Sequence, residues 1–425
     1  MTRTITKETV IHRIKERALP LDQTNRYDPL MERILDSKLV LLGEASHGTS
    51  EYYTHRAEIT KRLIQEKDFR FIAVEGDWPA CYKVNQYIKG LADTPDSAKQ
   101  VLESFDHWPT WMWANEEIIP LIEWLKDYNR DRPDDKKIGF YGLDLYSLWE
   151  SMELILNYLD RIGSRDIEKA KTALTCFHPH DRSVEKYGVH ASFFSEDCIE
   201  EVVDLLLTVQ KNKHFYTDDL EEALSLEMNA RVAVDAESFY RAMVRGGSES
   251  WNIRDRHMTD TLIALMNHHG PDAKGIVWEH NTHVGDARAT TMVDEGEINV
   301  GQLVREHFGD DPIFIVGFGS YQGSVIASGS WGDPFKVIDV PPAAEESWEY
   351  LFHAANPSDQ LLLIPSNDPT FHFIKGHRAI GVVYEPQYEL FGNYVATNLA
   401  KRYNAFVFID KSHALHPLEQ SKVVM

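Results

Sequence analysis

The sequence has 425 residues, which is enough for two or three average domains or for one large α/β domain with an insertion. Hydrophobic residues make up 43% and charged residues 26%, as is typical of a soluble globular enzyme. The formal net charge of −23 repels nucleic acid and anionic membranes, so we expect neither as a partner.

The cysteines and the absence of long apolar runs bear on the compartment. Cys81, Cys176 and Cys198 lie far apart and form no CxxC pair. An odd and sparse set of this kind predicts a reducing compartment and no disulfide framework. The N-terminal segment has no apolar core of signal-peptide length, and no run of about 18 apolar residues occurs anywhere. We therefore expect a cytoplasmic protein without a membrane-spanning segment.

Short apolar runs predict the strands of a sheet. They are nearly continuous in Val, Ile, Leu and Phe, which is typical of central parallel strands covered on both faces. Between the first two runs, Tyr52, Ile59 and Leu63 recur on one helical stripe, so the three segments predict a βαβ unit. The predicted strands are residues 38–44, 69–77, 137–144, 275–281, 312–319, 360–365, 379–384 and 405–410.

The stretch between the third and fourth predicted strands differs from the rest of the chain. It contains several segments with helical periodicity and no strand signal, and its length exceeds that of an ordinary crossover connection. The alternative is a set of ordinary crossover helices. We predict an α/β core of residues 1–149 and 270–425, with residues 150–269 as a helical insertion that acts as a cap.

Polar and charged side chains follow five of the predicted strands at their carboxyl ends. In open α/β sheets, ligands bind at this edge. The set is unusual because carboxylates and histidines follow several strands in succession. Its members are Glu44 and His47, then Glu75 and Asp77, then Asp144, then His280 and His283, and finally Ser320.

Each of these residues also has a purely structural explanation. Ser46 or Thr49 could cap the following helix, and for Ser46 we predict the cap. His47 could be a hydrogen-bonded turn residue. Gly43 and Gly48 indicate unusual backbone angles or the close approach of another group. The residues together favour a site, although each one alone favours the structural explanation.

Arg56 gives independent support for a site. Tyr52, Arg56, Ile59 and Leu63 follow one another at steps of four, three and four, so Arg56 falls on the stripe that faces the sheet. A buried guanidinium needs a charged partner, and Glu44 and Glu75 are the nearest candidates. The alternative is that the long side chain reaches solvent.

Several common catalytic and nucleotide-binding motifs are missing from the sequence. There is no GxSxG nucleophile elbow, no GxGxxG pattern in the glycine-rich residues 317–324, and no GxxxxGK[ST] loop. What remains is histidine and carboxylate chemistry that acts on water, and this chemistry needs no cofactor.

Several segments resemble the erythromycin esterase family, which includes succinoglycan-biosynthesis-like members. The resemblance runs from about residue 38 to the C-terminal FIDKSHALHPL, and its specific parts are GEASHG, VEGDWP and HNTHVGDAR. It implies hydrolysis of a carboxylic ester or a lactone, with a small-molecule substrate. The implied catalytic residues are His47 as general base, Glu44 and Glu75 as supporting carboxylates, Arg56, His280 and His283.

Other residues are candidates for binding the substrate, and two other functions stay open. Trp108, Trp111, Trp113, Tyr146 and Arg254 are the candidates, although core packing explains the tryptophans equally well. We assign no metal ligand, but a metal-dependent hydrolase with ligands His47, Glu75, His280 and His283 is one alternative. A binding protein that sequesters a ligand without turnover is the other. The oligomeric state does not follow from the sequence.

Overall fold

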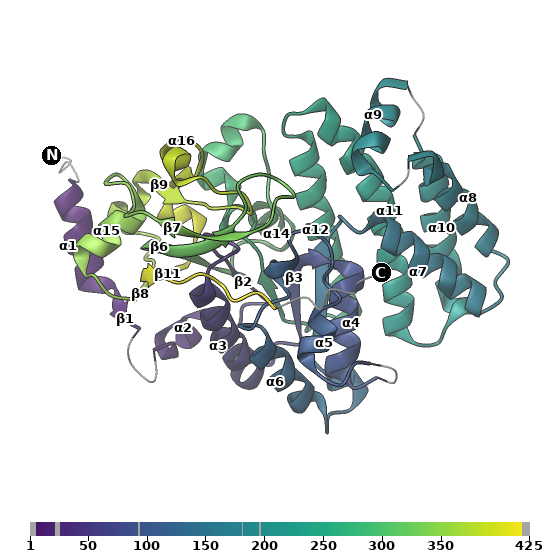
Figure 1. The fold of residues 1–425 in the computed structure, drawn as a ribbon. Coiled ribbons are helices and arrows are strands. Elements are labelled where there is room, and N and C mark those ends of the chain that lie inside the picture. Colours follow the sequence, from purple (N-terminus) through teal and green to yellow (C-terminus); the bar gives the residue numbers. More distant parts are fainter. Residues whose placement is uncertain (1–5, 22–25, 92–93, 181, 195–196, 419–425) are drawn as a thin grey trace. The chain divides into compact units, whose positions relative to one another are not determined.

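The computed structural model of the protein describes residues 6–21, 26–91, 94–180, 182–194 and 197–418 (Figure 1). The chain divides by its internal contacts into two compact units. Unit 1 comprises residues 1–72, 86–139 and 272–425, and unit 2 comprises residues 73–85 and 140–271.

Unit 1 is built on a mixed sheet with a parallel centre. Its strands follow the order β1-β8-β11-β6-β2-β5, and β7 pairs with the distal half of β6. The ladders β11/β6, β6/β2 and β2/β5 are parallel, whereas β8, β1 and β7 pair antiparallel. These strands are β1 (Leu19–Pro20), β2 (Leu39–Leu42), β5 (Gly275–Trp278), β6 (Ile313–Ala327), β7 (Lys336–Val340), β8 (Gln360–Leu363) and β11 (Ala405–Ser412).

The predicted α/β class with a mostly parallel central sheet is confirmed. Every residue of β2 and β5 is buried, as the uninterrupted apolar runs in the sequence predict. One predicted strand is wrong, because residues 379–384 make only isolated bridges, from Ile380 to Ser46 and from Val383 to Ser328. The strand lies just before them as β9 (Ile374–Arg378), paired antiparallel with β10 (Tyr394–Asn398) in a separate two-stranded sheet.

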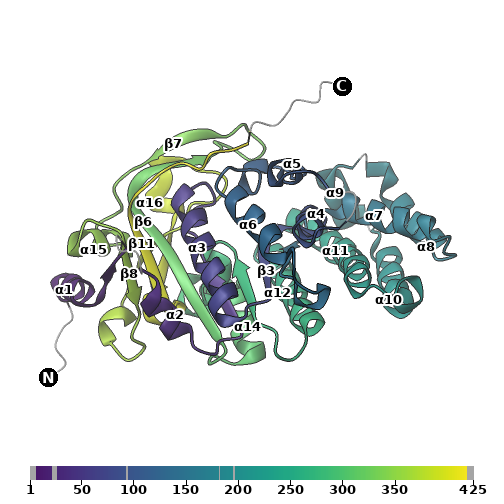
Figure 2. The ribbon, with the colours of Figure 1, turned by 90° about the horizontal axis from the view of Figure 1, so that it is seen from below.

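Helices cover this sheet, and α3 (Ser50–Lys67) is the one that matters most for the site. Figure 2 shows α3 beside β6 of the sheet. The Tyr52 ring of α3 meets Phe318 of β6 edge-on, at 5.8 Å between centroids. The indole of Trp278 in β5 donates to Thr60 Oγ1 of α3 at 3.0 Å. The helix therefore lies across several strands, with its predicted stripe turned toward the sheet.

The remaining helices of unit 1 pack around the sheet and at its edges. Several are only one turn long and serve as connectors between strands. They are α1 (Lys7–Arg17), α2 (Asp28–Ile34), α5 (Ala98–Leu102), α6 (Ile119–Asn129), α13 (Asn281–Val284), α14 (Val300–Phe308), α15 (Trp348–Ala355), α16 (Glu389–Gly392) and α17 (Leu399–Arg402).

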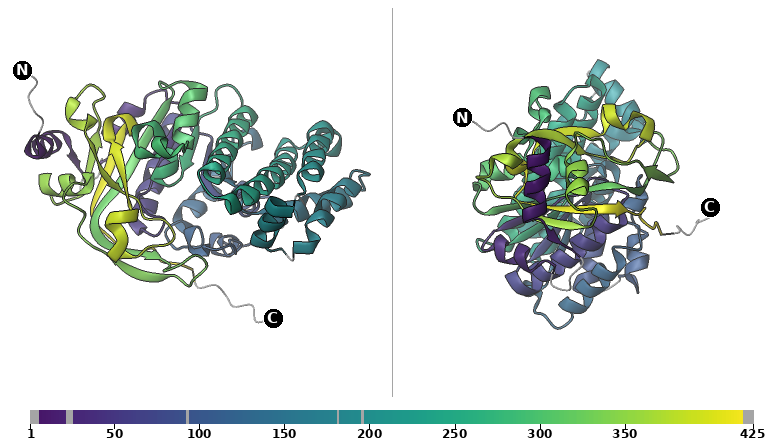
Figure 3. Two further views of the ribbon diagram at one scale, coloured as in Figure 1. Left: turned by 90° about the horizontal axis from the view of Figure 1, so that it is seen from above. Right: turned by 90° about the vertical axis from the view of Figure 1, so that its left-hand side faces the viewer.

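Unit 2 contains the neighbouring strands β3 and β4, except for their first residues, and a set of long helices that run side by side (Figure 3). Helical periodicity predicted the helices from residue 150 to residue 269 apart from α8 and α9, which had no clear signal. The elements are β3 (Phe71–Asp77), α4 (Trp78–Lys89, whose last four residues belong to unit 1), β4 (Gly139–Asp144), α7 (Leu148–Arg161), α8 (Ile167–Phe177), α9 (Val184–Phe194), α10 (Ile199–Tyr216), α11 (Leu220–Arg245) and α12 (Glu249–His269).

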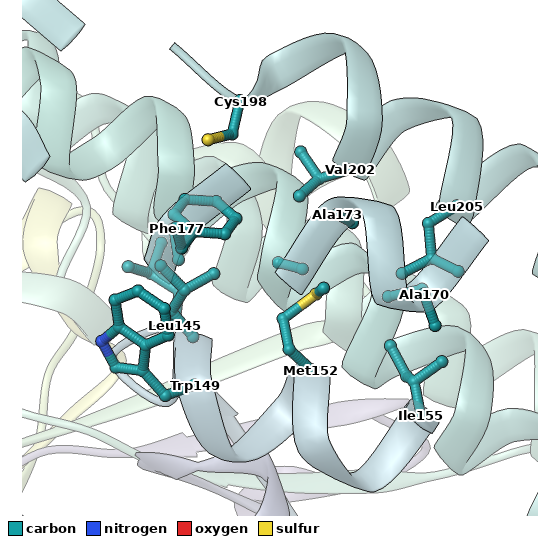
Figure 4. Close-up of a cluster of buried hydrophobic side chains, with 14 of the residues drawn as sticks. Leu145, Trp149, Met152, Ile155, Ala170, Ala173, Phe177, Cys198, Val202 and Leu205 are labelled. Carbon is teal, nitrogen blue, oxygen red and sulfur yellow. The ribbon is translucent and has the colours of Figure 1, made fainter. Parts of the chain in front are cut away.

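The helices of unit 2 bury a core of their own. Met152 and Ile155 of α7 face Ala173 of α8 and Val202 of α10 in a continuous apolar cluster (Figure 4). Their spacing puts one apolar stripe of each helix inward, so burial of these stripes holds the helices together. An independent core of this kind supports our proposal that the helical segment, predicted as residues 150–269, forms a distinct part of the protein.

The prediction of no disulfide bond is wrong. Cys176, in α8, and Cys198, at the N-terminus of α10, form a disulfide bond between positions 22 residues apart. Sequence spacing gave no sign of it, because the pairing depends on how α8 and α10 pack. The cysteine count therefore no longer supports the expectation of a reducing compartment.

We expect Cys176→Ser to lower the free energy of unfolding by about 3 kcal/mol, because closing a loop of this length restricts the unfolded chain. Urea denaturation followed by circular dichroism measures this difference. A reductant should shift the midpoint of the wild type and leave that of the variant unchanged. Three free thiols in the unfolded, unreduced wild type would contradict the prediction.

None of the described helices combines the length and the apolar character needed to cross a membrane.

Candidate active site

The segment GEASHG leaves the end of β2 through a tightly packed turn. The Gly43 N–H donates to Val316 O of β6 at 2.9 Å, and the Gly48 carbonyl accepts from the Ile326 N–H of the same strand at 3.0 Å. A Cβ on Gly43 would lie 2.1 Å from Asn281 Oδ1, and one on Gly48 would lie 1.9 Å from Ile326 O. The two glycines are therefore required by the close approach of neighbouring groups, as their position in the sequence suggested.

His47 and Glu44 form a buried pair in this turn. His47 Nδ1 lies 2.9 Å from Glu44 Oε1, and the two residues are only 7% and 2% exposed. With the carboxylate accepting from Nδ1–H, the neutral imidazole keeps its lone pair on Nε2. This is the tautomer that a histidine needs in order to act as a base through Nε2.

Arg56 holds the other oxygen of the same carboxylate. Its Nη2 donates to Glu44 Oε2 at 2.5 Å, and its Nε donates to the Tyr52 carbonyl at 3.2 Å. The guanidinium carbon lies 4.8 Å from the ring centre of Tyr53 and 4.5 Å from that of Trp278. Arg56 is 1% exposed, so the structure confirms the predicted inward orientation and excludes the alternative in which the side chain reaches solvent.

His280 lies beside His47. The two ring centroids are 5.0 Å apart and the rings are tilted by 42°. His280 Nδ1 accepts from the Thr282 N–H at 3.3 Å and lies 2.8 Å from the Thr282 hydroxyl. Because Nδ1 acts as an acceptor, the proton of the neutral ring is on Nε2.

His283 lies in α13, the short helix that follows β5 and has His280 as its N-cap residue. It is 2% exposed, and its backbone N–H donates to the His280 carbonyl at 2.9 Å. The predicted residues Glu44, His47, Arg56, His280 and His283 all belong to unit 1. Within unit 1, the structure brings His47 together with Glu44 and His280, and Glu44 with Arg56.

A second cluster of buried charges belongs to unit 2. Arg254 of α12 meets Asp144 with two hydrogen bonds, Nε to Oδ1 at 2.9 Å and Nη2 to Oδ2 at 2.6 Å. Its Nη2 also donates to Glu75 Oε1 at 2.7 Å, and its guanidinium carbon lies 5.3 Å from the ring centre of Tyr146. Burial alone would lower the pKa of Arg254, but the charges of Asp144 and Glu75 raise it well above its usual range.

This second cluster bears on the candidate partners of Arg56, which were Glu44 and Glu75. The carboxylate that pairs with Arg56 is Glu44, and Glu75 forms an ion pair with Arg254. Periodicity identified Arg56 as buried, but no local pattern in the sequence connects residue 75 with residue 254.

Two serines also differ from their predicted roles. Ser46 is not the N-cap of α3, since Thr49 occupies that position without a side-chain capping bond. The Ser46 hydroxyl lies 2.5 Å from the Thr49 hydroxyl instead. Ser320 does not follow a strand, because β6 continues past it to Ala327. The extension arises because β11 and then β7 pair with the distal half of β6.

The candidate substrate-binding aromatics differ in exposure. Trp111 and Trp113 are 1% and 5% exposed, which favours the alternative in which they pack in the core. Trp108 is partly exposed, its indole N–H donates to the Asp333 carbonyl at 3.1 Å, and its ring lies 4.5 Å from that of Trp331. Tyr146 packs edge-on against Phe239 in unit 2.

Sequence reasoning missed a further buried pair near the HNTH segment. His377 Nδ1 lies 2.5 Å from Glu349 Oε1, and its Nε2 lies 3.2 Å from Asn281 Nδ2. Both members of the pair are at most 1% exposed. The signal was weak, because His377 falls within a segment that was not predicted as a strand and Glu349 falls within a helix.

Within the described parts of the chain, the side chains of His, Cys, Asp and Glu form no group of three or more that is placed to hold a metal ion. The pairs above are instead completed by arginine, threonine and backbone groups.

Comparison with known proteins identifies the family. The family model described as Erythromycin esterase matches residues 64–412. The chain belongs to the erythromycin esterase family. Erythromycin esterase type II of Escherichia coli is 23% identical over 329 residues, which cover 72% of this chain and 75% of the relative. The putative hydrolase YbfO of Bacillus subtilis is 21% identical, with 94% of this chain and 90% of the relative covered.

Solved structures share the fold of this family member. A succinoglycan biosynthesis protein superimposes with a TM-score of 0.79 at 19% identity, covering 98% of this chain and 100% of the other. A mutant of the erythromycin esterase EreC in its open conformation gives a TM-score of 0.65 at 18% identity, covering 91% and 93%. The two solved structures show that this chain shares their fold. Membership of the erythromycin esterase family supports ester hydrolysis as the general activity of the family.

Proposed function

We propose that this protein hydrolyses a carboxylic ester or a lactone by direct attack of water, with His47 as the general base. The observation that carries the proposal is the buried Glu44–His47 pair at the end of β2, with the His280 ring beside it. The family match begins at residue 64, after this segment, so the roles of Glu44, His47 and Arg56 rest on geometry and on the sequence motif.

The geometry supports the following steps. His47 Nε2 takes a proton from water while the water oxygen bonds to the ester carbonyl carbon and the carbonyl electrons move to its oxygen. Glu44 holds Nδ1–H, so the ring keeps this tautomer and its positive charge is balanced as it forms. When the intermediate collapses, the C–O bond breaks and His47 returns the proton to the leaving alkoxide.

Arg56 and His280 take different parts in this scheme. Arg56 is buried between two aromatic rings and holds Glu44, so we assign it to fixing the carboxylate rather than to touching the substrate. His280, with a proton on Nε2, is the better candidate to donate to the oxyanion. His283 and Glu75 remain proposed members of the site, without a more specific role.

The substrate-binding residues are proposed more broadly. Trp108 offers a partly exposed indole face for an apolar part of the substrate. Tyr146 and Arg254, both in unit 2, remain candidates for binding the substrate. The substrate class is a small-molecule ester or lactone, and the sequence does not single out a macrolide.

A panel of p-nitrophenyl esters and lactones tests the proposal. We expect the purified protein to hydrolyse at least one member and to keep its activity after extensive treatment with a chelator. Stoichiometric zinc, manganese or iron, with activity lost to the chelator and restored by the metal, would instead establish the metal-dependent alternative. Tight binding of a lactone without turnover would establish the binding-protein alternative.

A further inference from the structure

Asn281 is tied by its backbone to the proposed catalytic turn. Its N–H donates to the Glu44 carbonyl at 2.8 Å, and its own carbonyl accepts from Arg402 Nη2 at 2.8 Å. Asn281 follows His280 directly in the chain. One residue therefore connects the backbone of the Glu44–His47 turn to the backbone that carries His280.

The side chain of Asn281 continues the sheet where β2 ends. Leu42 is the last residue of β2 in register with β6, opposite Val316. Beyond that point Asn281 Nδ2 donates to the Phe318 carbonyl at 2.6 Å, and the Phe318 N–H donates to Asn281 Oδ1 at 3.2 Å. The carboxamide thus replaces the next peptide group of β2, and Gly43 leaves the room that it needs.

His377 fixes the orientation of this carboxamide. The second N–H of Asn281 Nδ2 points to His377 Nε2 at 3.2 Å, while Nδ1 of the same ring bonds to Glu349 Oε1. This arrangement requires a neutral imidazole with its proton on Nδ1. Burial lowers the pKa of His377 and so favours the neutral ring, although the charge of Glu349 opposes this effect.

A rotated carboxamide would lose these bonds. Exchanging its oxygen and nitrogen would set two donors against each other at the Phe318 N–H and two acceptors at the Phe318 carbonyl. Asn281 is fully buried, so water is not at hand to compensate. The contacts from Glu349 through His377 to Asn281 therefore fix one orientation of the Asn281 carboxamide.

We propose that Asn281 is a positioning residue whose carboxamide, oriented by His377, holds His280 at a fixed separation from the Glu44–His47 pair. This inference rests on the proposed function, because it gives His280 and His47 a shared task. Displacing reacting groups by about 1 Å can cost on the order of 10²-fold in rate. Weakening the hydrogen bonds of the Asn281 carboxamide should therefore lower kcat.

Two substitutions of His377 separate positioning from folding. In His377→Gln the amide group lies near the position of Nε2 and can still accept from Asn281. In His377→Asn it lies near Nδ1 and can reach only Glu349. We expect comparable losses of melting temperature in both, a kcat about 10- to 100-fold lower in the asparagine variant with KM little changed, and most of kcat retained in the glutamine variant.

Asn129 supplies a matched control for Asn281 itself. Its buried carboxamide bridges the Ile138 N–H and carbonyl in the same manner, at 2.7 and 2.9 Å, within unit 1. Asn281→Asp replaces by an oxygen the nitrogen that donates to Phe318 O and His377 Nε2, and Asn129→Asp does the same to the nitrogen that donates to Ile88 O and Ile138 O. Both should melt lower, and only Asn281→Asp should lose kcat.

The outcomes distinguish this inference from the proposed function. A wild type that turns over esters while His377→Asn and Asn281→Asp keep full kcat would overturn the inference alone. If the wild type hydrolyses nothing, nuclear Overhauser contacts between the His47 and His280 rings decide the matter without turnover. They should be present in the wild type and the glutamine variant and lost in the asparagine variant, and unchanged contacts in all three would overturn the inference.

Discussion

Replacing His47 with alanine is expected to lower the rate of ester hydrolysis by about 10²- to 10⁴-fold and to leave the fold intact. The loss follows from removing the imidazole that takes the proton from water, while Arg56 still pairs with the remaining Glu44 carboxylate. Initial rates on whichever ester the wild type hydrolyses best, together with a circular dichroism spectrum, measure both parts of the prediction.

His353 provides the control for this substitution. It also pairs through Nδ1 with a carboxylate, Asp410 Oδ1 at 2.6 Å, and it is partly exposed in unit 1. His353→Ala should therefore keep nearly all of the activity. Equal losses in the two variants, or near wild-type turnover in His47→Ala, would mean that His47 is not the base.

Replacing Arg56 with leucine should lower the free energy of unfolding by about 3 to 5 kcal/mol, because the Glu44 carboxylate would remain buried without its cation. Activity should fall as well, since Glu44 would no longer be held in place for His47. Protonation of Glu44 would relieve part of the cost, so Arg56→Leu combined with Glu44→Gln should recover some stability but no activity.

Lysine at position 56 separates charge from geometry. It keeps the positive charge but lacks the planar fork that reaches Glu44 and the Tyr52 carbonyl at once, and it stacks less well between Tyr53 and Trp278. We expect Arg56→Lys to fold and to lose most activity. Melting curves and esterase assays on both variants make the measurement, and a fully active lysine variant would contradict the assigned role.

Arg62 on the same helix is the control for stability. It forms ion pairs with Glu66 at 2.6 Å and with Asp28 at 2.7 Å, and the three side chains are 23%, 42% and 48% exposed. Solvent screens such pairs, so Arg62→Leu should cost only about 0.2 to 1 kcal/mol for each pair. A similar cost for Arg62→Leu and Arg56→Leu would show that burial of the Arg56 pair is not what stabilises the turn.

The parts of the fold that the sequence predicted are those that local pattern determines. Continuous apolar runs identified β2 and β5, because strands buried on both faces need apolar side chains at every position. Helical periodicity placed Arg56 on the buried face of α3, because Arg56 lies on the same stripe as the apolar residues Ile59 and Leu63. Gly43 and Gly48 were informative since only glycine tolerates the contacts they make.

The parts that were missed depend on contacts between distant residues. Polar alternation is weak in β7, most of whose residues are exposed, and β9 and β10 pair with each other in a separate two-stranded sheet. The Cys176–Cys198 bond and the Arg254–Glu75 pair join positions that no local spacing connects. Glu349 and His377 meet only because a helix and a strand pack together, so the orienting pair behind Asn281 was not visible in the sequence.

Single-turnover hydrolysis in oxygen-18 water, with enzyme in excess over a lactone or ester that it cleaves, tests the central claim most directly. Direct attack by water that His47 activates predicts one oxygen-18 atom in the released carboxylate during the first turnover, with no acyl group on the protein at any time. An acyl-protein mass trapped during turnover, or a first product without the label, would show that a side chain is the nucleophile and would contradict the account.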